Sequence, residues 1–565
     1  MVLASTNPRR FAARPRSKAE WLIDIAILVL SLVMALPVIT VAVLALFPAE
    51  NIWPHLIATV LPGYVWRTLV LMAGVGALSF IIGTGTAWLV TMCRFPLRKV
   101  FQWALLVPLA LPTYIVAYAY VDFLTYAGPL QGWLRDVMGW KSPHDYWFPE
   151  VRSMGGAIVI LALVLYPYVF LTARASFLRQ STSQLEVART LGRTAWGAFF
   201  SVALPSARPA IAVGVSLVMM ECLNDIGAAG FFGIRTLSVG IYTTWLGQGN
   251  LGGASQIAAV MLVFVFAFLW IERIGRQQQS FAPSARKNRP IRRVPLKGWR
   301  AGLAFLACAM PVLLGFILPG AILLRFALHR FSDGLTPAFA RAAGHSLLLS
   351  ILAAAIALIL GLILAYGARN ARSVLVRYAT RIASIGYAVP GTVMGLGILI
   401  PFAAFDNSID GMMRSTFGVS TGLLLSGTIA AVTFAYVARF LAISAGSIES
   451  GLQRVTPNVA AAARTLGRTP LASFFEVHLP ILRPALVSAS LLVFVDCMKE
   501  LPATLILRPF DFETLATTVF TLASLDQLEE SALPALTIVA TGLIPVILLS
   551  RTLRDPRRMQ ENLTL

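Results

Sequence analysis

Two pairs of carboxylates lie inside apolar stretches of the chain. Glu221 and Asp225 are four residues apart, as are Asp496 and Glu500, so each pair shares one face of a helix. The pairs match each other at an offset of 275 residues. Placing a charge at the centre of a membrane helix costs about 2.5–3.5 kcal/mol, so such residues usually face a bundle interior or a pathway. The pattern predicts a pseudo-symmetric acidic wall along a translocation path.

Several roles remain open for these acids. Carboxylate oxygens suit a hard cation such as ferric iron, so the acids could bind a substrate directly. They could also line or gate the path without binding the substrate. In a purely structural role, Lys499 would neutralise Asp496 or Glu500, and the acids would hold loops near an outer gate. Cys222 and Cys497, which follow the first acid of each pair, are expected to be small buried hydrophobic residues.

The chain is expected to become irregular after each acidic pair. Residues 227–233 are rich in glycine, and residues 502–509 begin and end with proline. These residues break helices, which makes a re-entrant or gate segment plausible at both positions.

A second repeated feature is more polar. Residues 188–194 read ARTLGRT, and residues 463–469 read ARTLGRT again, also at an offset of 275. Seven identical residues in a row are far beyond chance similarity, so the chain contains two repeats, which are parallel if each half has an even number of spans. At an offset of 278, Gly83 matches Gly361, Ala87 matches Ala365 and Pro112 matches Pro390.

The first copy predicts two short helices joined at a glycine. Ser183 and Glu186 form a capping box at a helix start, and Gly192 can adopt the left-handed conformation that stops that helix. Thr194 can then cap a second short helix.

The second copy predicts the same arrangement. Thr456-Pro457 and Thr469-Pro470 each supply a cap and a first-turn proline, with Gly467 at the bend. One such segment could be merely a well-capped loop. Two matched copies favour a docking surface for a two-fold symmetric partner.

Membrane spans must position these residues. The 565-residue chain is 58% hydrophobic and 13% charged, about half the charged fraction of a soluble protein. A span takes about 20 apolar residues. Such runs lie near 22–47, 66–91, 101–124, 154–174, 208–230 and 253–272, and again near 301–327, 343–368, 376–404, 420–443, 482–507 and 532–551. The expected fold is an all-α polytopic membrane protein with two parallel repeats of about six transmembrane helices.

The net charge of +21 is unevenly distributed. Basic residues gather before the first span, between the halves and at the C-terminus, which is the positive-inside pattern of cytoplasmic segments. Both termini are therefore expected in the cytoplasm. Segments 122–153, 231–252, 405–419 and 508–531 are expected outside. A nucleic-acid surface would interleave aromatic and basic residues on a polar fold, which this chain lacks.

The repeated segment resembles the EAA loop of permease subunits of bacterial ABC importers, which forms a coupling helix in a cleft of the cytoplasmic ATPase. The resemblance implies a type I importer fold and an ATPase-coupling role for the residues at the family positions. These are Glu186, Ala188, Gly192, Leu204 and Pro205 in the first copy and Ala463, Gly467, Leu479 and Pro480 in the second. Ala461 replaces the glutamate in the second copy, so the two ATPase contacts are expected to differ.

The resemblance covers nearly the whole chain. It implies a permease domain at 1–273 with its coupling loop at 183–205, a basic cytoplasmic linker at 274–300, and a second permease domain at 301–565 with its loop at 456–480. It also implies two copies of an ABC ATPase and a periplasmic binding protein as partners, in a bacterial inner membrane. The chain has no GxxxxGK[ST] phosphate loop, so the sequence predicts a transport subunit that is not itself an enzyme and binds no ATP.

The substrate is indicated less firmly. Residues 224–245 and 499–520 resemble fused iron(III)-importer permeases, and permeases for thiamine, phosphonates and polyamines are similar. A proton-coupled secondary transporter that uses the four acids is the rival from another class. The five histidines are scattered and predict no metal site.

Overall fold

The structure is a computed structural model that describes residues 18–48, 51–180, 186–188, 190–277, 293–370, 373–453, 455, 459, 462–463 and 465–552. Nearly all of its elements are helical, as the sequence predicts. The first half contains α1 (Lys18–Leu46), α2 (Trp53–Ala58), α3 (Leu61–Met92), β1 (Cys93–Arg94), α4 (Arg98–Ala104), η1 (Val107–Ala110), α5 (Thr113–Leu124), α6 (Pro129–Met138), α7 (Met154–Arg179), α9 (Ala195–Ala198), η2 (Phe199–Ala203), α10 (Leu204–Asn224), α11 (Gly227–Phe231), α12 (Leu237–Tyr242), η3 (Thr243–Gly247) and α13 (Leu251–Gln277).

The second half follows the same order. It contains β2 (Val294–Pro295), α14 (Trp299–Val312), η4 (Leu313–Ile317), α15 (Leu318–His329), α16 (Phe331–Gly334), α17 (Pro337–Asn370), α18 (Val374–Ala383), η5 (Ile385–Ala388), α19 (Gly391–Phe417), α20 (Ile429–Leu452), α22 (Pro470–Ser473), η6 (Phe474–His478), α23 (Leu479–Met498), α24 (Pro502–Leu507), α25 (Leu515–Ser524) and α26 (Leu528–Thr552).

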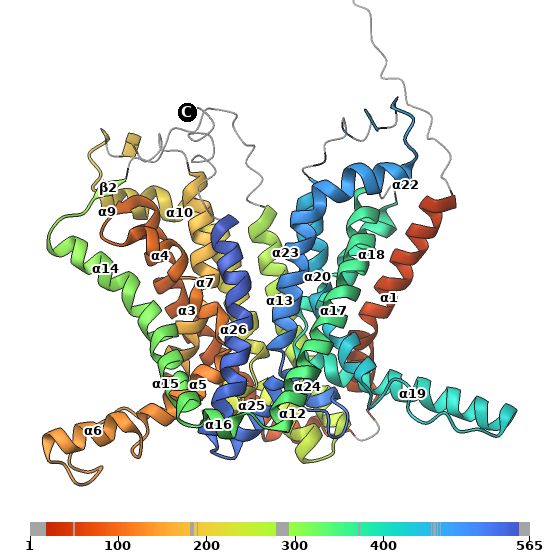
Figure 1. The fold of residues 1–565 in the computed structure, drawn as a ribbon, viewed down its shortest axis with the longest axis horizontal. Coiled ribbons are helices and arrows are strands. Elements are labelled where there is room, and N and C mark those ends of the chain that lie inside the picture. Colours follow the sequence, from red (N-terminus) through yellow and green to blue (C-terminus); the bar gives the residue numbers. More distant parts are fainter. Residues whose placement is uncertain are drawn as a thin grey trace, which may run out of the picture.

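Ten of the described helices are long and apolar enough to cross a membrane, or eleven if one bent pair counts as a span. The expected run 532–551 coincides with α26, which lies in the bundle beside the others (Figure 1). The expected runs 101–124 and 376–404 are not single helices, which corrects the sequence-based prediction. Each run is interrupted after a short 3₁₀ turn, just before Pro112 or Pro390. The helix ends there because proline disfavours a helical conformation in the residue before it.

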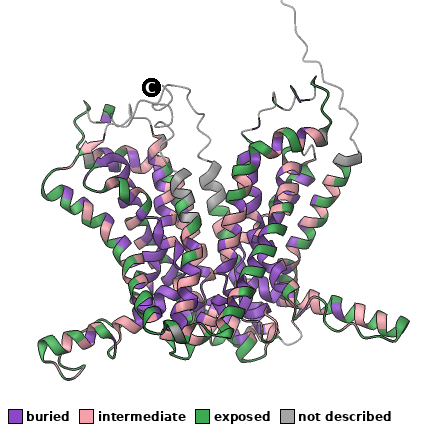
Figure 2. Ribbon diagram, in the orientation of Figure 1, coloured by how far each residue is buried: buried purple, intermediate pink, exposed green. Residues whose placement is uncertain are grey.

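The helices form two bundles. Figure 1 shows them meeting at the end that carries α12, α16, α24 and α25, and diverging toward the end that carries α9 and α22. In Figure 1, α6 and the far part of α19 extend sideways at the end where the bundles meet. Buried residues concentrate where the bundles meet (Figure 2).

The sequence repeat is also a repeat of packing. Gly83 and Gly361 are the points where α3 approaches α7 and α17 approaches α20. A Cβ at Gly83 would lie 2.7 Å from Val169 Cβ, and one at Gly361 would lie 3.0 Å from the Ala445 amide. Small residues at such positions allow membrane helices to approach closely. The structure therefore confirms the two repeats.

The two halves exchange their first helices. α1 packs on the second half, where Ser31 Oγ donates a hydrogen bond of 2.7 Å to the carbonyl oxygen of Ala379 on α18. In the other direction, Tyr120 on α5 donates to the carbonyl of Leu314 on η4. β2 pairs with β1, next to the predicted linker. Because each half contributes a helix to the packing of the other, the structure does not test the domain boundaries 1–273, 274–300 and 301–565, which stay predictions.

Candidate functional site

A cavity of about 100 Å³ lies where the two halves meet, and it is large enough to hold several water molecules. All four acids predicted from the sequence line it, so the structure brings together residues that are 275 positions apart. The other polar lining residues are Thr113, Tyr114, Tyr168, Asn224, Tyr387, Arg439 and Lys499.

The acids of the first half have hydrogen-bond partners but no ion-pair partner among the described residues. Asp225 is buried at the end of α10, where it accepts hydrogen bonds from Thr113 Oγ1 and, at 3.0 Å, from the Ala229 amide. The second bond caps the first turn of α11. Glu221, one turn earlier, accepts a hydrogen bond of 3.4 Å from Tyr387 Oη of the other half.

The acids of the second half are neutralised within that half. Glu500 forms an ion pair of 2.5 Å with Arg439, and the two side chains are 5% and 6% exposed. Glu500 Oε1 also accepts a hydrogen bond of 3.1 Å from the Ala503 amide, which caps α24. Asp496 pairs with Lys499 at 2.9 Å. Lys499 thus pairs with Asp496, one of the two partners that the sequence offered, whereas Glu500 pairs with Arg439.

Arg439 is the main residue that sequence reasoning missed. It lies on α20 within an apolar run, and an ionisable group in such a run is itself a signal of function. Its counterpart in the first half is Val164, which also lines the cavity. The cavity therefore carries four acids and two bases, and both bases come from the second half.

Further contacts cross between the halves next to the acids. Asn224 Oδ1 accepts a hydrogen bond of 2.7 Å from the Gly391 amide at the start of α19. A Cβ at Gly391 would lie 2.6 Å from Glu500 Oε1 and 2.8 Å from Arg439 Nη1. A side chain at Gly391 would displace these groups, so the absence of one lets the start of α19 approach the Arg439–Glu500 pair closely.

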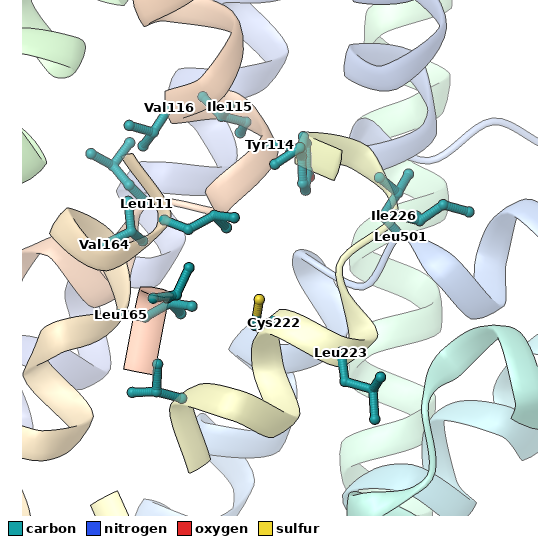
Figure 3. Packing of buried hydrophobic residues seen from close by; sticks show 14 of the residues in the cluster. Leu111, Tyr114, Ile115, Val116, Val164, Leu165, Cys222, Leu223, Ile226 and Leu501 are labelled. Carbon is teal, nitrogen blue, oxygen red and sulfur yellow. The ribbon is translucent and has the colours of Figure 1, made fainter. Parts of the chain in front are cut away.

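Apolar residues close the cavity where the spans break. Ile226 and Leu501, equivalent at an offset of 275, line it together and are almost fully buried (Figure 3). A Cβ at Gly227 would lie 3.0 Å from Leu501 Cδ2, so the two turns are in contact. α11 and α24 follow directly. Each span does break after its acids, at residues 225–226 and 499–501, but the prediction that residues 227–233 and 502–509 are irregular is wrong, because they form the short helices α11 and α24. The expected span 208–230 ends earlier, at Asn224.

The lining acids do not form a chelating cluster. Within the described ranges, no three His, Cys, Asp or Glu side chains are grouped closely enough to hold a metal ion. Cys222 and Cys497 are buried free thiols, as expected. An ion in this cavity would meet separate carboxylates, most of which already have partners.

The two repeated polar segments have the same local structure. Gly192 and Gly467 have φ angles of +82° and +77°, the left-handed conformation predicted for the end of a helix. In the first copy the Arg193 amide donates to the carbonyl of Ala188 at 3.0 Å, and in the second the corresponding bond joins residues 468 and 463 at 3.0 Å. The glycine bend is thus confirmed in both copies.

The helix that follows each bend is capped as predicted. Thr194 Oγ1 accepts a hydrogen bond of 3.1 Å from the Gly197 amide, and Thr469 Oγ1 accepts one of 3.2 Å from the Ala472 amide. Leu204-Pro205 and Leu479-Pro480 then form the first turns of α10 and α23. Ser183, Thr456, Pro457 and Ala461 lie outside the described residues, so the capping box and the missing glutamate stay predictions.

Both bends present apolar side chains to the outside. Leu191 is 78% exposed and its counterpart Leu466 is 81% exposed, while Ala188 and Ala463 are buried beneath them. Glu186 is exposed beside the first bend. Both segments lie at the end of the molecule where the bundles diverge (Figure 1). Exposed apolar residues that recur in this way are typical of a protein-binding surface.

The two segments differ in charge. Arg468 forms an ion pair of 3.1 Å with Glu476, whereas Ser201 takes the glutamate's place in the first copy. Sequence reasoning noted only the difference at Ala461. The two surfaces are therefore alike in shape and unlike in electrostatics.

Comparison with known proteins agrees with this architecture. Residues 79–277, from α3 to α13, match the family described as "Binding-protein-dependent transport system inner membrane component". Over this segment, about a third of the chain, the protein is similar to permeases of this family. It is accordingly a multi-pass inner-membrane protein and a transport subunit of an ABC importer, a class that works with an ATPase and a substrate-binding protein.

Individual relatives differ in how much of the chain they match. The Fe(3+)-transport system permease protein FbpB 2 of Haemophilus influenzae is 25% identical over 86% of this chain and 89% of its own length. The sulfate transport system permease protein CysW of Escherichia coli is 27% identical over 47% of this chain and 91% of its own length. The molybdenum transport system permease protein ModB of Escherichia coli is 26% identical over 38% of this chain and 96% of its own length.

Proposed function

We propose that this permease imports ferric iron and that the cavity between its halves is the translocation path. The four acids Glu221, Asp225, Asp496 and Glu500 would line that path. Ile226 and Leu501 would form its apolar closure toward the outside. The bundles diverge toward α9 and α22, which corresponds to an inward-facing state if that end is cytoplasmic, with both termini there as the basic residues predict.

The charge of the cavity supports iron over the substrates of the shorter relatives. Two more acids than bases line it, and the unpaired ones, Glu221 and Asp225, belong to the first half. Such a surface attracts a cation and repels an oxyanion such as sulfate or molybdate. The iron-permease relative also matches both halves, whereas the sulfate and molybdenum relatives cover less than half of the chain. Acid excess in the cavity is the observation that carries the assignment.

The repeated segments would couple the path to ATP. We assign ATPase contact to the residues at the two bends, with one ATPase copy on each. These are Glu186, Ala188, Gly192, Leu204 and Pro205 on one side and Ala463, Gly467, Leu479 and Pro480 on the other. Each bend leads directly into α10 or α23, the helices that carry the acids. Closure of an ATPase dimer would bring the bends together and open the apolar closure toward a periplasmic binding protein.

The experiment is uptake of labelled ferric iron into proteoliposomes that contain the permease, its ATPase and its binding protein. Glu221→Gln should slow uptake by about tenfold or more, because unit charges 4 Å apart at an effective dielectric of 20 interact by about 4 kcal/mol. Glutamine keeps an acceptor for Tyr387. The matched control is Asp136→Asn on α6, which removes the same charge from an exposed position outside the cavity and should leave uptake unchanged.

Other outcomes separate the alternatives. ATP-dependent uptake of sulfate, molybdate, a phosphonate, thiamine or a polyamine in place of iron would overturn the iron assignment. Uptake that needs a proton gradient but no ATP would indicate the secondary transporter and would exclude the coupling role of the bends.

A further inference from the structure

A second cavity lies on the first half, away from the acids. It is a groove of about 570 Å³ between α3, α10 and α13, and its lining is almost entirely apolar. Phe80, Met219 and Phe268 represent the three helices. Its volume is within the range of small-molecule binding sites.

The groove faces away from the translocation cavity. On α10, Met219 lies two residues before Glu221 and therefore points to nearly the opposite side of the helix. Gly214, on the side of Glu221, packs against α7, where its Cβ would lie 2.9 Å from Val169 Cα. α3, α10 and α13 belong to helices that are long and apolar enough to cross a membrane, so a groove on this side of them would open to lipid.

One charged side chain lies at the end of this groove. Arg208 is exposed in the second turn of α10, the helix that follows the Gly192 bend, α9 and η2. No carboxylate in the described part of the chain forms an ion pair with it. A guanidinium forms two parallel hydrogen bonds to a phosphate, and basic pockets between helices on the cytoplasmic side bind anionic lipid headgroups.

We propose that this groove binds an anionic phospholipid, with an acyl chain along Val215, Met219 and Phe268 and the phosphate on Arg208. The proposal rests on the proposed function only for the orientation of the permease in the membrane. That orientation places Arg208 at the cytoplasmic leaflet. The bound lipid would join α10 to α3 and α13 immediately after the first coupling bend. The lipid would thereby stabilise that bend against the force from the ATPase.

The repeat offers a matched control. Arg483 is the counterpart of Arg208, in the same turn of α23, and it is outside this groove. Arg208→Gln and Arg483→Gln thus remove the same charge at the same depth. Ala212→Trp provides an independent change, because Ala212 is an exposed lining residue and an indole there fills the groove without altering charge.

The test is native mass spectrometry of the delipidated permease titrated with palmitoyl-oleoyl phosphatidylglycerol. We expect saturable binding of one lipid that is about tenfold weaker in Arg208→Gln, consistent with loss of a charge-assisted hydrogen bond. Ala212→Trp should also weaken it, whereas Arg483→Gln should not. Inorganic phosphate should not compete, because it cannot occupy the apolar part of the groove.

Three results would overturn the proposal: equal binding of phosphatidylcholine, equal effects of the two arginine variants, or full competition by inorganic phosphate. Lipid binding is measured without iron, ATPase or binding protein. A failed iron-uptake experiment therefore leaves this test intact, and a failed lipid titration leaves the iron assignment intact.

Discussion

At the scale of single residues, charge is distributed unequally between two halves of similar fold. Arg439 and Glu500 form a buried ion pair in the second half, while Val164 takes the arginine's position in the first. Desolvating two charges costs several kcal/mol each, and the attraction between them offsets that cost only when both are present. Glu500 is thus held as a fixed, neutralised cap for α24, and the free negative charge is left to Glu221 and Asp225.

Breaking this pair on one side should be far more damaging than removing it. Arg439→Met leaves Glu500 buried without a partner and should lower the free energy of unfolding by about 3–5 kcal/mol. Adding Glu500→Gln should recover part of the loss, because glutamine still accepts from the Ala503 amide. The measurement is thermal unfolding of the detergent-solubilised permease, with both single variants and the double variant compared. An unchanged midpoint in Arg439→Met would contradict the ion pair.

The acids could be predicted from the sequence, but their partners could not. The sequence shows that the two pairs of carboxylates are equivalent in the repeat, and the structure places all four at one cavity. The partner of Glu500 depends on how far α20 is rotated against α23, which a sequence pattern does not determine. The hydrogen bond between Asn224 and the Gly391 amide was equally invisible, because it joins the ends of helices from opposite halves.

At the scale of elements, each glycine bend precedes a helix that continues into α10 or α23. Gly192 and Gly467 are both left-handed, and no atom lies within 4 Å of a Cβ built on either of them. A side chain there meets open space, so a substitution acts through the backbone conformation alone. The local hydrogen bonds of these bends followed from residue types, which is why the sequence predicted them well.

A pair of substitutions at one glycine separates conformation from contact. Gly192→Val should weaken ATPase binding and coupled transport by about tenfold, because a left-handed L-residue costs roughly 1–2 kcal/mol. Gly192→Asn should retain most of both activities, since asparagine tolerates this conformation. Pull-down of the ATPase by the tagged permease, followed by ATP-dependent uptake, measures the two effects. Equal losses in both variants would show that the bend is not required.

The breaks in the membrane spans were harder to predict. Runs 101–124 and 376–404 look like ordinary spans in hydropathy, yet each is divided at Pro112 or Pro390. The repeat had already marked these prolines as equivalent. Hydropathy gives the length of an apolar run and not its direction. The 90° bend between Arg98–Ala110 and Thr113–Met138 could therefore not be predicted from it.

At the scale of the whole molecule, the two halves are joined by exchanged helices more than by the linker. α1 contacts α18 and α19, and η4 contacts α5 and α7. The close approach of α1 to α19 depends on Gly397, where a Cβ would lie 2.7 Å from the carbonyl carbon of Pro37. The sequence predicted two halves correctly but not their exchange, because a repeat offset carries no information on which half a helix packs against.

Cutting the chain between the halves should therefore not separate them. With a protease site inserted into residues 278–292, a tag on the first half should still retain the second half after cleavage in mild detergent. Gly397→Val should weaken this association because it displaces α1 from α19. Gly411→Val, on the same helix with no atom within 4 Å of its Cβ, is the control and should have no effect. Co-elution by size exclusion measures the outcome, and prompt separation of the unmodified halves would contradict the exchange.

The exchange of α1 also sets an order of events at the ribosome. α1 is the first span to be synthesised, but the surfaces it packs against, α18 and α19, are among the later ones. During translation α1 can pack against α13 once the first half has been inserted, but it lacks α18 and α19 until part of the second half has been made. The bundle of the second half therefore incorporates a helix made at the very start of the chain, and a chain truncated before α18 would leave α1 in the membrane without its packing surface on α18 and α19.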